Sequence, residues 1–220
     1  GERCLIVGST GSGKTTWAQL FSRLIEPDQG AILVNDRPIG EYYIKELRQA
    51  VSYVPQDVFL FSDTIEANLR FGNEEATQEK IIEVSKAVCL HEEVLRFSEG
   101  YKTVVGERGV TLSGGQKQRL ALGRALLKPA SLYVLDDCLS AVDVQTERRI
   151  LDALEAMAGE SAWVVITHRV PTHFRFDRVI CLDQGRIVEQ GNPVSLAASD
   201  GIYAKLLAEA NAENRSANSL

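Results

Sequence analysis

The chain has 220 residues, of which 45% are hydrophobic and 25% are charged, and this composition excludes a disordered or fibrous protein. A net charge of −6 argues against a dedicated nucleic-acid binder. The four cysteines are scattered, without a Cys-x-x-Cys pair, which indicates free thiols rather than a disulfide framework or a zinc site. No apolar run reaches the length of a membrane-spanning helix. The chain starts at Gly1 with an apolar strand close behind, so we expect a segment of a longer protein.

Predicted strands and helices alternate along most of the chain, which is typical of an α/β fold built on a mostly parallel sheet. The predicted strands cover residues 4–7, 31–34, 51–54, 132–135, 163–167, 179–182 and 186–189. The predicted helices cover residues 14–25, 44–50, 114–127 and 142–158, and two further helices close the chain. Asp143 or Ser140 is expected to cap the helix at 142–158, and Asn192 with Pro193 to start the first closing helix.

Residues 59–109 differ from the rest of the chain, because they show little strand signal. Their helical patterns cover residues 64–71, 77–88 and 91–97. We expect a mostly helical subdomain here, inserted into an α/β core that comprises residues 1–58 and 110–210. The polar tail, residues 211–220, is expected to fray. The whole chain is then one domain in two parts.

The first chemical motif, residues 8–15, reads Gly-x-x-x-x-Gly-Lys-Thr and follows the strand predicted at 4–7. Its glycines let successive backbone N–H groups point at phosphate oxygens, and the helix that follows adds its positive dipole end. Lys14 is expected to bind the β- and γ-phosphates of a nucleotide, and Thr15 to ligate Mg²⁺. The alternative, a glycine-rich turn without function, matches this pattern by chance in roughly one such chain in a hundred. The predicted nucleotide contacts are Gly8, Ser9, Thr10, Gly11, Ser12, Gly13, Lys14, Thr15 and Thr16.

Two acids follow the buried strand predicted at 132–135. In parallel α/β sheets the carboxyl ends of the strands are where ligands bind. Asp136 is expected to reach Mg²⁺ directly or through water, and Asp137 to orient or deprotonate an attacking water. The alternative is that the pair only caps the next helix, since carboxylates favour helix starts.

A second glycine-rich helix start, residues 112–116 (Leu-Ser-Gly-Gly-Gln), narrows the interpretation from a general phosphate-loop ATPase to one family. With it, nearly the whole chain resembles the nucleotide-binding domain of ATP-binding-cassette (ABC) transporters. The motifs follow the family's order. Residues 8–15 resemble Walker A, Gln56 the Q-loop glutamine, residues 112–116 the signature, residues 135–137 the end of Walker B, residues 140–143 the D-loop, and His168 the switch histidine.

The resemblance implies a P-loop NTPase core with a small antiparallel β part near the N-terminus, here truncated, and an inserted helical subdomain. It implies ATP and Mg²⁺ as ligands, with Asp137, His168 and Gln56 as catalytic residues. The metal ligands would be Thr15, Gln56 and Asp136. It also implies a head-to-tail dimer with a second nucleotide-binding domain. Each ATP then lies between Walker A of one domain and Ser113, Gly114, Gly115 and Gln116 of the other.

The subclass resembles ABC exporters. Residues 103–109 are similar to the exporter X-loop, and residues 59–65 to the exporter pattern after the Q-loop. The aromatic side chains of Phe59 and Phe61 suit a groove for a helix of the transmembrane domain, although a locally buried hydrophobic staple is the alternative. The resemblance implies a bacterial multidrug-type half-transporter at the cytoplasmic face of the inner membrane. Its partners would be its transmembrane domain and a second, different nucleotide-binding domain, with no nucleic acid.

One departure supports the heterodimer. Asp137 stands where catalytically full sites of the family carry Glu, and the missing methylene shortens its reach by about 1 Å, a misplacement that costs about 100-fold in rate. We therefore expect a degenerate site beside an intact signature. The family's adenine-stacking aromatic residue would precede Gly1, so we also expect weakened ATP affinity.

Two rival functions stay open. An ATP-binding clamp with little turnover of its own fits Asp137. A non-transport ABC ATPase of DNA repair or translation fits less well. Residues 57–112 between Gln56 and Ser113 leave no room for the long coiled-coil arm of a repair ATPase, and translation factors of the family carry two cassettes in one chain.

Overall fold

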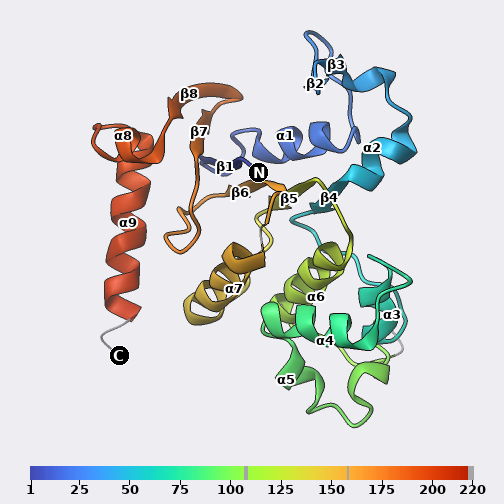
Figure 1. Ribbon diagram of the computed structural model, residues 1–220. Helices are drawn as coiled ribbons and strands as arrows, with labels where there is room; N and C mark the ends of the chain where they lie inside the picture. Colours follow the sequence, from blue (N-terminus) through green and yellow to red (C-terminus); the bar gives the residue numbers. More distant parts are fainter. Residues whose placement is uncertain (107–108, 158, 218–220) are drawn as a thin grey trace.

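The computed structural model describes residues 1–106, 109–157 and 159–217, and they form a six-stranded sheet with helices on both faces (Figure 1). Its strands are β1 (Arg3–Gly8), β4 (Val51–Val54), β5 (Leu132–Asp136), β6 (Ala162–Thr167), β7 (Arg178–Asp183) and β8 (Arg186–Gly191). The order across the sheet is β4-β5-β6-β1-β7-β8, and only the β7–β8 pair is antiparallel. A second sheet pairs β2 (Leu33–Val34) with β3 (Arg37–Pro38) in antiparallel fashion. The predicted α/β fold, with a mostly parallel sheet and a small antiparallel part, is confirmed.

Helices and short 3₁₀ turns connect these strands. They are α1 (Lys14–Phe21), η1 (Ile39–Glu41), α2 (Ile44–Ala50), α3 (Ile65–Arg70), α4 (Gln78–Ala87), α5 (His91–Val94), η2 (Gly100–Lys102), α6 (Gly114–Leu127), α7 (Val144–Met157), α8 (Pro193–Ala197) and α9 (Ile202–Ala217). The bounds of α2, β4 and α6 match the sequence prediction. None of the helices in the described part of the chain combines the length and apolarity that a bilayer crossing requires.

The two faces of the sheet are buried in separate hydrophobic clusters, because side chains alternate along each strand. In β1, Leu5 and Val7 join the cluster that contains α6 and α7, whereas Ile6 joins the cluster beneath α1. Figure 1 shows α1 on one side of the central strands and α6 and α7 on the other. Near-continuous apolar strands are what a sheet covered on both faces requires. Because β5, β6 and β1 are parallel neighbours, their carboxyl ends lie at one edge of the sheet.

The helical insertion packs against α6. Residues 59–109 contain α3, α4, α5 and η2 in their described part, and α3 and α4 both contact α6. Side chains at the centre of this contact, such as Leu69, Ile81 and Leu120, are fully buried. These helices form a body to one side of the sheet (Figure 1). The exact division of the chain at residues 59 and 110 stays a prediction.

Helix α1 ends four residues earlier than the predicted boundary at Ile25. Arg23 adopts a left-handed conformation with φ of 49°. The Leu24 N–H donates to Gln19 O at 2.9 Å and the Arg23 N–H to Leu20 O at 3.0 Å, which is a Schellman C-cap. Glycine usually marks this motif, so its absence hid the helix end from sequence reasoning.

The chain's last described segment is helical, and the frayed tail expected at residues 211–220 stays a prediction. Residues 211–217 continue α9, whereas residues 218–220 lie outside the described part. The helix is held at its start, because the Tyr203 N–H donates to a Glu189 carboxylate oxygen at 2.9 Å and the Tyr203 side chain is buried. Apolar side chains farther along, Leu206, Leu207 and Ala210, pack on the core and extend the helix.

Candidate functional site

The phosphate-loop motif forms a tight turn between β1 and α1. A Cβ atom on Gly8 would lie 2.1 Å from the Leu182 carbonyl oxygen, so only glycine fits the close approach of the neighbouring strand. Gly13 starts α1 with φ of 97° and no side-chain cap. Because no side chain caps them, the first N–H groups of α1 are available for an anion.

The Lys14 ammonium lies inside this turn. Its Nζ donates to Gly8 O and to Ser9 O, each at 2.8 Å. Burial lowers the pKa of Lys14 below its ordinary value, while the carboxylates of Asp137 and Asp136 act in the opposite direction. The loop thus combines one side-chain cation with the uncapped backbone N–H groups of α1, an arrangement suited to the oxygens of a polyphosphate.

Asp136 ends β5 and is 1% exposed. Burial raises the pKa of this carboxyl, and hydrogen bonds from the Thr15 and Tyr53 hydroxyls oppose the shift. The Tyr53 Oη lies 3.4 Å from Asp136 Oδ2. No sequence motif indicated Tyr53, which comes from the neighbouring strand β4. A hydroxyl and a carboxylate side by side form a set of hard oxygen donors.

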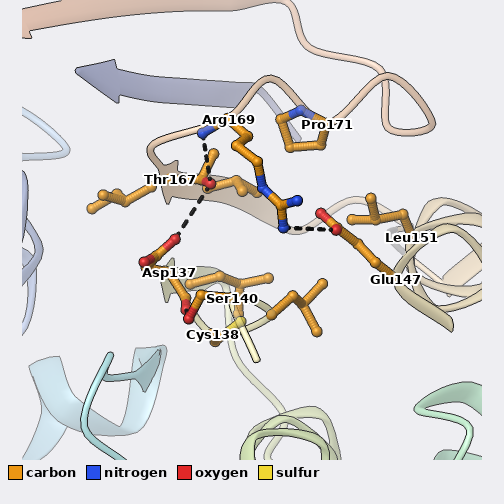
Figure 2. Close-up of a pocket in the computed structure, with 12 residues that line it drawn as sticks. Asp137, Cys138, Ser140, Glu147, Leu151, Thr167, Arg169 and Pro171 are labelled. Atoms are coloured by element: carbon orange, nitrogen blue, oxygen red, sulfur yellow. Dashed lines mark hydrogen bonds and ion pairs between the residues drawn. The ribbon is translucent and has the colours of Figure 1, made fainter. Parts of the chain in front are cut away.

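Asp137 occupies a left-handed backbone position, with φ of 47°. Its Oδ1 lies 3.0 Å from His168 Nδ1 and accepts a hydrogen bond from Thr167 Oγ1 at 3.4 Å. Figure 2 shows Asp137 pointing towards Thr167. Two of the three predicted catalytic residues are therefore in direct contact. Thr167 was missed, although its place immediately before His168 at the end of β6 could have indicated it.

Behind Asp137 an ion pair joins the His168 loop to α7. Arg169 Nη2 lies 3.2 Å from Glu147 Oε2, and Figure 2 shows the two side chains meeting above a small cavity. Burial raises the pKa of Glu147, and the charge of Arg169 opposes this rise. The cavity measures about 30 Å³, enough for a water molecule.

The Asp143 Oδ1 caps α7 by accepting from Thr146 N at 3.0 Å, so Ser140 is not the cap.

A cavity of about 270 Å³ unites the predicted residues from four separate parts of the chain. Its lining comprises Thr10, Gly11, Gly13, Lys14, Thr15, Thr16, Gln56, Asp136, Asp137 and His168. All the predicted catalytic and metal-ligating side chains thus surround one space. Gly8, Ser9 and Ser12 belong to the same turn but are not among the lining residues.

The donors around this cavity fit Mg²⁺. Among the described residues no group of three or more His, Cys, Asp and Glu side chains is arranged to hold a metal. Mg²⁺ does not need one, because it is usually bound through one or two protein oxygens, several waters and the substrate phosphates. Thr15, Asp136 and the amide oxygen of Gln56 are oxygen donors of this kind.

The signature segment (112–116) lies apart from that cavity, at the start of α6. Ser113 and Gln116 form a capping box: Gln116 N donates to Ser113 Oγ at 3.2 Å, and Ser113 N donates to Gln116 Oε1 at 2.9 Å. Ser113 and Gly114 are exposed. None of the four signature residues predicted to bind nucleotide lines the phosphate-loop cavity.

Glu93 of α5 is hydrogen-bonded to two side chains in the first turns of α6. It accepts from Gln116 Nε2 at 2.8 Å and from two Arg119 nitrogens at 2.7 and 3.1 Å. Burial raises the pKa of Glu93, but the hydrogen bonds from Arg119 and Gln116 outweigh it and leave the pKa below its ordinary value. Both the oxygen and the nitrogen of the Gln116 amide are therefore hydrogen-bonded within the chain. No pattern in the sequence pointed to Glu93.

A groove of about 350 Å³ lies between the helical insertion and β4. Phe59 on its rim is 68% exposed, so the alternative of a buried staple is wrong for this residue. The Arg124 guanidinium lies 5.4 Å from the Phe61 ring centre and 5.6 Å from that of Phe71. Burial lowers the pKa of Arg124. In the nearby segment 103–109, Glu107 and Arg108 lie outside the described residues.

The fold and this cavity define a phosphate-loop nucleotide-binding protein. The family model "ABC transporter" matches residues 1–140. The chain is 43% identical to Heavy metal tolerance factor 1 of Caenorhabditis elegans, over 98% of this chain and 27% of that protein. It is 44% identical to an ATP-dependent lipid A-core flippase of Chromohalobacter salexigens, over 94% of this chain and 36% of that protein.

Among solved structures, a bacterial Atm1-family ABC exporter with ATP bound matches with a TM-score of 0.89 and 39% identity, over 95% of this chain and 37% of that one. The chain belongs to the ABC transporter family, and its enzyme class is that of the ABC-type ATPases. It spans about a third of the length of these relatives.

Proposed function

We propose that this chain binds Mg-ATP and, paired head to tail with a second nucleotide-binding domain, powers export by an ABC transporter. The observation that carries the proposal is the separation of the two anion-receptive helix starts. The phosphate loop lines a cavity with Lys14, Asp136 and Asp137, whereas Ser113 and Gly114 lie exposed elsewhere. One triphosphate cannot use both starts in one chain, so each signature would serve a partner's nucleotide.

The phosphate loop would bind the β- and γ-phosphates. Backbone donors at the start of α1 surround the oxygens, and the Lys14 ammonium exchanges its carbonyl acceptors, Gly8 O and Ser9 O, for phosphate oxygens. Burial lowers the pKa of Lys14 although the carboxylates of Asp137 and Asp136 oppose the shift, so the ammonium would gain from pairing with phosphate. The other predicted loop residues would contribute backbone contacts.

The metal ligands would be Thr15 and Asp136, with Gln56 completing the protein's share. When bound, Mg²⁺ neutralises charge on the phosphates and orients them for in-line attack. The Thr15 hydroxyl would turn from Asp136 to the metal. The raised pKa of Asp136 falls when a cation lies beside the carboxylate, so nucleotide binding would favour its ionised form.

Asp137 and His168 would handle the attacking water. The Asp137 carboxylate would accept its proton, and His168 would orient that carboxylate through the 3.0 Å contact. Asp137 is one methylene shorter than the Glu that the family resemblance predicts here, and both Thr167 and His168 already hold its Oδ1. We infer a slow site in this chain and a full site on a different partner. A clamp that binds ATP with little turnover is the limiting case.

The rest of the transporter would attach at the groove beside Phe59 and Arg124. Exposed aromatic rings and a buried cation there suit a helix from a transmembrane domain. The relatives' names concern a lipid A-core flippase and an Atm1-family exporter, which supports export across a membrane. We propose a place at the cytoplasmic face of the inner membrane and a substrate range of the multidrug type.

Lys14→Ala tests the nucleotide site. The substitution removes the mobile cation of the loop, so the affinity of the purified chain for a fluorescent ATP analogue in Mg²⁺ should fall at least tenfold. Lys45→Ala, a change of the same kind on the exposed side of α2, is the matched control. Equal affinities for all three proteins would contradict the proposed site.

A further inference from the structure

Gln118 in α6 has a buried side chain that no part of the proposed mechanism uses. It is 8% exposed, and both ends of its amide are bound. Its Oε1 accepts from the Ala141 N–H at 2.9 Å, and its Nε2 donates to Ser140 Oγ at 3.0 Å. A backbone N–H can only donate, so the amide orientation is fixed by chemistry. Gln118 therefore ties the signature helix to the D-loop (140–143).

The connection continues from Ser140 to Asp137. The Ser140 hydroxyl has one hydrogen, which it donates to the Asp137 carbonyl oxygen at 2.9 Å, and it accepts from Gln118. Asp137 sits at φ of 47°, a conformation that an L-residue keeps only when its surroundings hold it. The Asp137 N–H also donates to Ile166 O at 2.7 Å, so both sides of the strained residue are held.

Close packing makes this link stiff. A Cβ atom on Gly115 would lie 2.8 Å from the Ala141 carbonyl oxygen, so the first turn of α6 rests directly on the D-loop backbone. A shift at Ser113 or Gly114 must therefore move the D-loop, since no flexible side chain lies between them. Packed interiors transmit such shifts because they contain little free volume.

We propose that Gln118 is a positioning residue that couples the signature surface to Asp137 within one chain. Contact of a partner's nucleotide with Ser113 and Gly114 would reset the Asp137 turn through Gln118 and Ser140. The two nucleotide sites of a dimer would then communicate through each chain and not only across the interface. This inference rests on the function proposed above.

Gln118→Glu is the sharpest test, because the shape is kept and one hydrogen bond is reversed. The introduced carboxylate still accepts from Ala141 N–H, but it cannot donate to Ser140. The Ser140 hydroxyl is then drawn to the carboxylate and releases the Asp137 carbonyl. Ser140→Ala cuts the same link at an exposed position where folding is not at risk. Gln78→Glu, on the exposed first turn of α4, makes the same chemical change away from the D-loop.

The measurements are ATP binding by the purified chain and steady-state ATPase of an assembled transporter in which the partner's catalytic acid is neutralised, so that the turnover measured is that of this chain's own site. We expect both D-loop variants to bind ATP within about twofold of wild type, while kcat falls about tenfold and KM stays within twofold. The double variant should be no slower than either single variant, because both act through one link. Gln78→Glu should match wild type.

Hydrogen exchange provides a readout that does not need turnover. Upon Mg-ATP addition to the assembled wild-type transporter, amide protection should rise together at residues 113–116 and at Ala141. In the variants, only residues 113–116 should respond. The inference would be overturned if both variants kept the wild-type kcat and still gained amide protection at residues 113–116 and Ala141 together. It would also be overturned if kcat fell only in proportion to a loss of ATP affinity. A wild-type chain that binds no ATP would instead contradict the proposed function, and the inference with it.

Discussion

At the scale of single residues, the backbone conformation at position 137 favours a short side chain such as that of Asp. Its left-handed backbone position, with φ of 47°, suits Asp and Asn better than other side chains, because a short polar group can bond locally there. The carboxylate uses this geometry to reach His168 and Thr167. The same contacts hold the short acid beside the end of β6, which supports the slow site proposed above.

Asp137→Glu tests this interpretation. The added methylene restores reach, and the small cavity beside Cys138 and Thr167 has room for it. Turnover of the assembled transporter should rise up to about tenfold, less the cost of a longer side chain in a left-handed position. Steady-state ATPase at saturating ATP measures it. A fall below the wild-type rate would show that reach is not what limits this site.

Short sequence motifs predicted residues that the structure brings around one cavity, and the roles of these residues stay predictions. Lys14, Thr15, Asp136 and His168 each follow or precede a predicted strand, and parallel strands bring their carboxyl ends together. Side-chain direction is not encoded in this way. Gln116 was expected to contact nucleotide, yet its amide is bound within its own chain, and its role at the nucleotide stays a prediction.

At the scale of elements, the start of α6 is the second functional surface. Its capping box and the Glu93 contacts fix the helix end, while Ser113 and Gly114 face solvent. A rigid helix start with exposed N–H groups is ready to receive an anion from another molecule.

Gly114→Asp should separate binding from turnover. The introduced carboxylate would repel the partner's γ-phosphate, so ATPase of the assembled transporter should fall at least tenfold. ATP affinity of the purified chain should not change, because its own cavity is not lined by Gly114. Normal turnover in the variant would mean that residues 112–116 do not act on a partner's nucleotide.

Glu93 is expected to make the stability of the chain around the start of α6 depend on pH. Its pKa is lowered in the folded chain, so its contribution to stability is complete above the unfolded value of 4.5 and is lost as pH falls through the folded value. Glu93→Gln should lower the unfolding midpoint at pH 7 by about 2–4 °C, and the difference should shrink below about pH 4. Thermal unfolding at both pH values checks this, with the exposed neighbour change Glu92→Gln as control. A constant difference at both pH values would rule out the charge as the cause.

Element boundaries were predictable where caps or prolines mark them. Ser113 and Asn192 carry such marks, and α6 and α8 start where expected. The strand predicted at 31–34 shrinks to β2, because its partner β3 has only two residues to pair with it. Tertiary pairing, which no local pattern contains, decides such lengths.

At the scale of the whole molecule, neither the strand order nor the contact between the helical insertion and α6 could be predicted from local patterns. The order β4-β5-β6-β1-β7-β8 places the first strand in the middle of the sheet, where β5 and β6 arrive much later in the chain. This arrangement is what brings Lys14 and Asp137 together. The α6 contact places the signature surface and the Phe59 groove on opposite ends of one rigid helix.

The central claim is that this chain has a slow site of its own and completes a faster one on a different partner. Steady-state ATPase of the assembled transporter, with Asp137→Asn on this chain or the corresponding acid neutralised on the partner, tests it most directly. We predict that Asp137→Asn leaves most of the activity and that the partner's variant removes nearly all of it. Loss of nearly all activity upon Asp137→Asn would contradict the account and identify Asp137 as the working base.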